Sequence, residues 1–249
     1  MPTLSTPPRR STRIPQALLF CLLLPGLLVS PLAAEPQATQ EQATQERADE
    51  KPVASPEERW QAIRDFLRND EKRKLKKALE APDVSEVQAE DGKGLGFLVA
   101  FGKDPELVDL VLARKPDLSQ VDKDGLSPLI FAAQRGNALA VTKLAQAGAE
   151  LDATDPGGRT ALIHAAVAGR VESCRALVEA GADVDIRDRH GAGALIYAAA
   201  KGFYDIPKLL LEHEADPNFR TAGGETALSL ARRKKAQRVE RLLLRHGAR

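Results

Sequence analysis

Two side chains of this sequence, His164 and Cys174, are of the types that form a catalytic nucleophile–base pair. An imidazole next to a thiol can take up its proton and leave a nucleophilic thiolate. The sequence shows no group that would orient this imidazole, and both residues fall where a repeated pattern places packing side chains. We therefore predict no catalytic residue. An enzyme with a pocket near His164 and Cys174 is the less favoured alternative.

Other signatures of catalysis or metal binding are missing from the sequence. Cys174 is the only thiol after residue 34, and the four histidines have no spacing that resembles a zinc site. There is no G-x-S-x-G turn, no phosphate loop and no G-x-G-x-x-G motif. We expect neither a metal nor a cofactor.

The elements that must position these residues come from a pattern that returns every 33 residues. Leucines hold one register and alanines hold another: Leu129, Leu162, Leu195 and Leu228; Ala132, Ala165, Ala198 and Ala231. A fixed period of this length indicates a stack of small, similar units. Each unit reads as a glycine turn, a Ser or Thr helix cap, an apolar first helix and a second helix closed by glycine.

This unit resembles the ankyrin repeat. The string TALIHAAVAGRVESCRALVEAGADVD, from Thr160 to Asp185, carries the resemblance. It implies an all-α fold, an ankyrin-type α-solenoid of stacked helix-turn-helix repeats with short β-turn tips. The family usually has a histidine directly after T-P-L, but that register here holds Ile130, Ile163, Ile196 and Ser229. We expect the hydrogen bonds of that histidine to the turn to be absent or replaced.

The same register divides the chain. We predict a signal peptide (1–34), a Gln/Glu/Ala-rich disordered linker (35–54) and an ankyrin repeat domain (55–249). Within that domain we expect N-terminal capping helices (55–90), a degenerate repeat (91–121), three repeats (122–154, 155–187 and 188–220) and a C-terminal capping repeat (221–249). Ser55 and Glu58 form a predicted capping box, Trp60, Ile63 and Phe66 mark the buried helix face after it, and Asp70 opens the next helix.

The first 34 residues have the pattern of a secretory signal. Arg9, Arg10 and Arg13 precede a short apolar run, and small residues follow it before Glu35. We expect cleavage after Ala34 and a secreted or periplasmic bacterial protein. A membrane-tethered scaffold whose N-terminal anchor is never removed is an alternative. Membrane contact is expected only through such an uncleaved segment.

The residues that the repeat leaves free are the candidates for binding. In proteins that this chain resembles, the turn tips and the exposed side of each first helix form a concave binding surface. Carried onto this sequence, the partner-binding residues are Lys123, Asp124, Leu126, Arg135, Arg159, Arg187, Arg189, His190, Lys201, Arg220 and Glu225. The resemblance therefore implies a non-enzymatic protein–protein interaction module.

Basic residues dominate this predicted surface. Six of its cations, Arg135, Arg159, Arg187, Arg189, Lys201 and Arg220, outnumber Asp124 and Glu225. We expect a protein partner with an acidic or polar patch, because arginine is favoured at the centres of interfaces. The net charge is +1, or −2 without the three arginines of the predicted signal. A near-neutral chain gives no reason to expect nucleic acid, and we expect a monomer.

Overall fold

The computed structural model describes residues 55–81 and 83–249. The predicted signal peptide and linker lie outside the described residues. The described part forms α-helices arranged in consecutive pairs, with no β-strand among them, which confirms the predicted all-α repeat fold. The pairs are α2 (Pro56–Arg68) with α3 (Lys72–Leu79), α4 (Leu95–Leu98) with α5 (Pro105–Leu112), α6 (Pro128–Arg135) with α7 (Ala138–Gln146), α8 (Ala161–Val167) with α9 (Val171–Glu179), α10 (Ala194–Lys201) with α11 (Asp205–Glu212), and α12 (Ala227–Arg233) with α13 (Gln237–Arg245).

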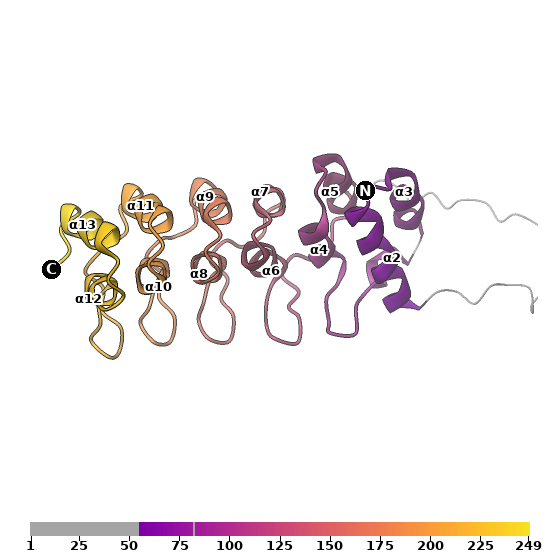
Figure 1. Ribbon diagram of the computed structural model, residues 1–249. Helices are drawn as coiled ribbons and strands as arrows, with labels where there is room; N and C mark the ends of the chain where they lie inside the picture. Colours follow the sequence, from indigo (N-terminus) through magenta and orange to yellow (C-terminus); the bar gives the residue numbers. More distant parts are fainter. Residues whose placement is uncertain (1–54, 82) are drawn as a thin grey trace, which may run out of the picture. The chain divides into compact units, whose positions relative to one another are not determined.

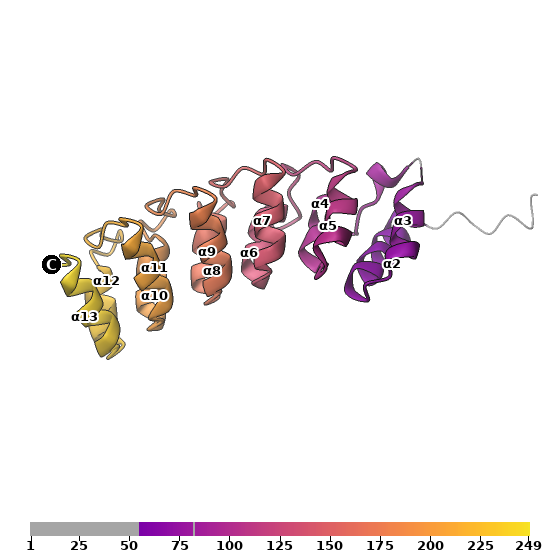
Figure 2. The ribbon, with the colours of Figure 1, turned by 90° about the horizontal axis from the view of Figure 1, so that it is seen from above.

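The pairs stack side by side in chain order. Figure 1 shows the first helices α6, α8, α10 and α12 in one row, the second helices α7, α9, α11 and α13 in another, and a loop projecting from the first-helix row between successive pairs. Figure 2 shows the same order from above. Two short 3₁₀ turns, η1 (Val84–Glu86) and η2 (Val99–Phe101), complete the N-terminal part. We call the projecting loops the tips.

The chemistry of each unit explains where its helices begin and end. Ser127 and Thr160 cap α6 and α8, each accepting the N–H of the residue three positions on at 3.3 Å. Pro128 takes the first position of α6, where a missing N–H breaks no helical bond. Gly136 and Gly202 end α6 and α10 with φ of 81° and 79°, a left-handed conformation that glycine adopts without strain.

The core is one continuous layer of the repeated apolar residues. The four leucines of the repeat are at most 5% exposed, and the four alanines are fully buried. Helices α6, α8, α10 and α12 contact one another in that order, so equivalent residues lie in neighbouring layers. No single pair could bury this face alone, and stacking supplies the stability.

Side chains at one register link the loops that follow the second helices. Asp152 accepts the N–H of Asp183 at 3.1 Å, and Asp185 accepts that of Asp216 at 3.1 Å. Asn218 continues the series, with its Oδ1 accepting the N–H of Arg249 at 3.0 Å. Each bond joins one repeat to the next, so the stack is held by polar contacts outside its apolar core.

The tips form a second, backbone ladder. The N–H of Lys123 donates to the carbonyl of Asp91 at 3.0 Å, that of Arg189 to Gly157 at 3.1 Å, and that of Ala222 to His190 at 2.8 Å. The equivalent donor in the remaining tip is residue 156, which is proline and has no N–H. The ladder is therefore interrupted between the tips that begin at Asp122 and Asp155.

The N-terminal pair follows its predicted pattern with two corrections. The capping box at Ser55 and Glu58 is present, and α2 buries Trp60 and Ile63. Leu67 rather than Phe66 completes the fully buried face, because it lies one turn beyond Ile63. The second helix begins at Lys72 instead of Asp70.

The backbone explains that later start. Asp70 takes a φ of 56°, in the left-handed region, and so turns the chain between α2 and α3. At the other end of the stack, the basic residues Arg232 to Lys235 and Arg238 are exposed. This is the polar outer face expected of a terminal repeat.

Candidate binding surface

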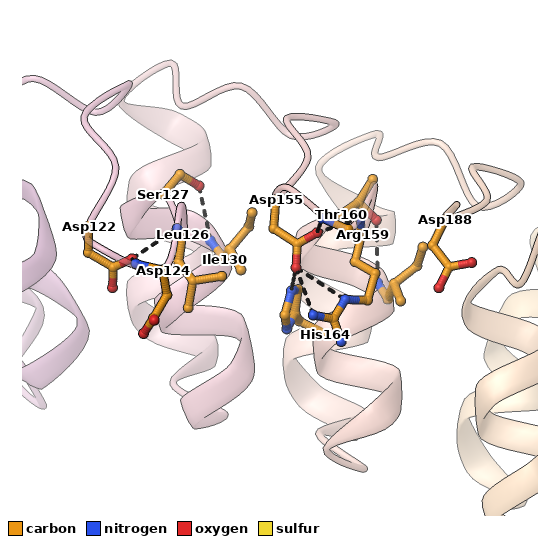
Figure 3. Close-up of polar contacts among 12 residues, drawn as sticks. Asp122, Asp124, Leu126, Ser127, Ile130, Asp155, Arg159, Thr160, His164 and Asp188 are labelled. Carbon is orange, nitrogen blue, oxygen red and sulfur yellow. Dashed lines mark hydrogen bonds and ion pairs between the residues drawn. The ribbon is translucent and has the colours of Figure 1, made fainter. Parts of the chain in front are cut away.

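A buried aspartate organises each of three successive tips. Asp122, Asp155 and Asp188 are 33 residues apart and 5–7% exposed. One carboxylate oxygen of each accepts the backbone N–H groups two and four residues later, at 2.7–3.0 Å. Figure 3 shows the arrangement at Asp122 and Asp155. In the last tip Thr221 takes this position and accepts only the N–H of Glu225 at 3.2 Å.

The second oxygen of each aspartate has a different partner in each tip. Asp155 Oδ2 lies 2.9 Å from Nε2 of His164 and 3.0 Å from a guanidinium nitrogen of Arg159. Asp188 accepts the hydroxyl of Tyr197, and Asp122 Oδ2 forms an ion pair with Lys93 at 3.0 Å. At the register where the family usually has a histidine, these three repeats have isoleucine. The contact to the turn is made instead by the side chains one position later, His164 and Tyr197.

The prediction that no group orients the imidazole of His164 is wrong, because Asp155 holds it. The His164 ring contacts Asp155 in the same repeat, nine residues before it in the chain. Burial lowers the pKa of His164, although the hydrogen bond to Asp155 opposes this effect. Burial acts to raise the pKa of Asp155, but hydrogen bonds from the Arg159 backbone and from His164 outweigh it and leave that pKa below its usual value.

Cys174 has the environment of a packing residue. Its side chain is fully buried in α9, and burial raises its pKa to about 12. A thiol with this pKa stays protonated at neutral pH, and solvent does not reach it. The His164 ring is engaged by Asp155, and no hydrogen bond joins it to Cys174 among the described residues, so the structure gives no support to a nucleophile–base pair.

The structure exposes most of the predicted binding residues. Eight are exposed, namely Lys123, Asp124, Arg135, Arg187, Arg189, His190, Lys201 and Arg220, and three are half-buried, namely Leu126, Arg159 and Glu225. We refer to these eleven residues as the tip surface. Ala192, which the same register places on this surface, is only 5% exposed because it packs into the base of its tip. The part that these residues play in binding stays a prediction.

Several members of the tip surface already have intramolecular partners. Arg159 pairs with the buried Asp155, and Glu225 pairs with Arg233 of α12. Arg135 lies over the Phe101 and Phe131 rings, at 4.6 and 5.4 Å from their centroids, and Arg187 lies over Phe219 at 4.4 Å. Arg159 is therefore part of the framework of its tip, whereas the stacked arginines keep their charge free for a ligand.

Sequence reasoning missed three cations near this surface. Lys93 holds the register of Leu126 and Arg159 one unit earlier, so the period alone could have identified it. Arg68 and Lys103 come from the N-terminal helix pair and from the turn before α5, where the repeat pattern is faint. No sequence signal places these two beside Arg135.

Nowhere in residues 55–81 and 83–249 do three His, Cys, Asp or Glu side chains come together as a metal site would require. No helix in these ranges combines the length and apolar character needed to cross a bilayer.

Comparison with known proteins agrees with the stacked pairs. A family model described as ankyrin repeats in three copies matches residues 95–188, and one described as ankyrin repeats in many copies matches residues 177–231. No curated protein matches the chain. The two matched segments cover residues 95–231, more than half of the 249 residues. With twelve helices in the described part paired as such repeats require, the chain belongs to the ankyrin repeat family.

Proposed function

We propose that this chain is a non-catalytic module that binds a protein partner through the tip surface. Ankyrin repeats typically mediate protein–protein interaction, and the burial of the Cys174 thiol, which raises its pKa to about 12, supports a non-catalytic role. The partner carries an acidic or polar patch. The tips and first helices are chosen because they carry the exposed cations of the tip surface.

One observation carries the choice of partner. Six cations of the tip surface are exposed and have no carboxylate within ion-pair distance among the described residues: Lys123, Arg135, Arg187, Arg189, Lys201 and Arg220. Elsewhere in the described chain many lysines and arginines are paired, as Lys143 is with Asp109 and Arg232 with Glu240. A row of unneutralised cations attracts an acidic surface and repels a basic one, which favours both encounter rate and specificity.

The test reverses charge on this surface without touching its framework. The variant Arg187→Glu, Arg189→Glu and Lys201→Glu leaves Arg159 in place, because Arg159 holds Asp155. The matched control, Arg73→Glu, Lys76→Glu and Lys77→Glu, makes the same change in net charge on α3 with residues that are also exposed and unpaired within the described part.

The partner is first captured by cross-linking in the native compartment and identified by mass spectrometry. Its affinity for wild-type protein and both variants is then measured by titration. We expect the tip variant to bind at least about tenfold more weakly, with a reduced dependence on salt, and the α3 control to bind as wild type does. Unchanged affinity in the tip variant would show that the partner uses another face.

We further propose that the module works outside the cytoplasm, as a secreted or periplasmic protein. The support is the order of basic, apolar and small residues before Glu35. N-terminal sequencing of the mature chain tests it, with a new terminus at Glu35 as the expected result. A mature chain that retains Met1 would contradict cleavage and favour the membrane-tethered scaffold.

A further inference from the structure

A cationic pocket lies at the C-terminal end of α6, the end of this first helix that is remote from its tip. It adjoins the tip surface through Arg135. It has a volume of about 610 Å³ and lies between the C-terminal ends of α2 and α6 and the turn before α5. Its charged lining residues are Arg68, Lys103 and Arg135. No aspartate or glutamate lines it, and none of the three forms an ion pair among the described residues.

Aromatic rings hold two of these cations in place. The guanidinium carbons of Arg68 and Arg135 lie 5.1 and 4.6 Å from the centroid of the Phe101 ring. The distance between the two carbons therefore cannot exceed the sum of these two values. Phe101 is itself fixed between Phe131 at 5.9 Å and Trp60 at 5.7 Å. Stacking on a packed ring orders an arginine before any ligand arrives, which reduces the entropy lost on binding.

The two guanidinium groups repel each other. The pKa of Arg135 is lowered by burial and by the positive charge of Arg68. An anion between them would relieve that repulsion, and guanidinium forks match the two oxygens of a carboxylate.

Backbone dipoles act against an anion here, and their size can be compared with the side-chain charges. The C-terminal ends of α2 and α6 face the pocket, and each contributes roughly −0.5 of an elementary charge. Asn137 reduces the effect of nearby carbonyls, because its side-chain amide donates to those of Ala100 and Gly102 at 3.0 and 2.9 Å. Three full positive charges outweigh the two partial negative ones, and the pocket remains positive.

We propose that this pocket is the anchor site for an acidic peptide segment of the protein partner, with neighbouring carboxylates held by Arg68, Lys103 and Arg135. The inference rests on the proposed function and adds the chemistry of the segment that is bound. A peptide is favoured over a small inorganic anion because the pocket is wide enough for more than one side chain and opens next to the tip surface. Arg135 belongs to both and joins them.

The probe is a fluorescent tetraglutamate peptide, with tetraglutamine as its uncharged counterpart and inorganic phosphate as a competitor. Binding to full-length protein is measured by fluorescence anisotropy. The chain's single tryptophan, Trp60, gives a second readout, because it packs edge-on against Phe101 of the pocket. The test variants are Arg68→Gln and Lys103→Gln.

The matched control is Arg238→Gln, which also removes an arginine stacked on a ring, since Arg238 lies 4.2 Å from the Tyr204 centroid at the other end of the stack. Far-UV circular dichroism confirms that each variant is folded. We expect each pocket variant to weaken tetraglutamate binding about three- to tenfold, the control to bind as wild type does, and tetraglutamine not to bind.

Three outcomes would overturn the proposal. The first is wild-type affinity for tetraglutamate in the double variant Arg68→Gln, Lys103→Gln. The second is an equal loss of tetraglutamate affinity in Arg238→Gln, which would mean general attraction to positive charge. The third is that the pocket binds phosphate but not the peptide. These outcomes leave the proposed function standing, because that is tested with the captured partner and the Arg187, Arg189 and Lys201 variant. Conversely, tetraglutamate could bind the pocket as expected while the Arg187, Arg189 and Lys201 variant binds the captured partner with wild-type affinity. That result would refute the tip surface as the binding face and leave the pocket proposal standing.

Discussion

Replacing Asp155 by alanine should destabilise the protein far more than the equivalent change in the last tip. The Asp155 side chain is 3% exposed and accepts two backbone N–H groups, at 2.7 and 2.9 Å, besides its contacts with His164 and Arg159. Removing one partner of a buried ionic network costs about 3–5 kcal/mol, because the remaining groups are left buried without partners. Thr221→Ala removes one hydrogen bond at the same register and should cost about 1 kcal/mol.

Urea unfolding followed by far-UV circular dichroism measures both changes. We expect Asp155→Ala to lose about 3 kcal/mol more than Thr221→Ala, and Asp155→Asn to lie between them. The asparagine keeps an oxygen for the backbone donors but loses the charge that Arg159 pairs with. If Asp155→Ala and Thr221→Ala lose the same stability, the buried carboxylate is not what organises the tip.

Three further predictions concern single side chains. The folded state lowers the pKa of His164, so as the pH falls the unfolded chain takes up a proton before the folded chain does. The free energy of unfolding should therefore be constant above about pH 6.5 and decrease as the pH drops through the lower folded pKa. His164→Tyr, which copies Tyr197 and keeps a donor for Asp155, should flatten that fall in urea midpoints measured from pH 7 to pH 5, and an unchanged slope would assign it to other groups. Cys174 should react with a thiol reagent only on unfolding, and Cys174→Val should change stability by less than about 1.5 kcal/mol and leave partner binding unaltered; rapid labelling of native protein would contradict its burial. Asn137→Ala should lose about 2–3 kcal/mol, since it removes the cap of α7 and two bonds to the preceding repeat, whereas Asn137→Ser, which keeps a cap, should lose about half as much by the same denaturation.

The repeat architecture could be predicted from the sequence because its determinants are local and recur. Caps such as Thr160, closing glycines such as Gly136 and the buried leucines each mark the same point in successive units. A shift by 33 residues therefore transfers one assignment to the next. Asp122, Asp155 and Asp188 share one register of the same period, but their burial and their role in the tips are visible only in the structure.

The contacts that decide the charge of the binding face could not be predicted in this way. His164 appears unoriented in the sequence, because its partner lies nine residues earlier in a turn whose fold brings the two together. The cationic pocket depends on Arg68 from the capping pair meeting Arg135 over Phe101, and no periodic rule connects these residues. Long-range meetings of side chains from irregular parts of the chain leave no signal in one sequence.

The proline at position 156 has a mechanical consequence for the row of tips. On either side of it, neighbouring loops are joined by main-chain hydrogen bonds, whereas across it Pro156 lies against Gly125 without one; a Cβ on Gly125 would come within 2.5 Å of its ring. The row thus consists of two blocks of tips, each joined internally by main-chain hydrogen bonds, that meet at a junction without such a bond. A bulky ligand that spreads the row would open that junction first, since parting the blocks there breaks no main-chain bond.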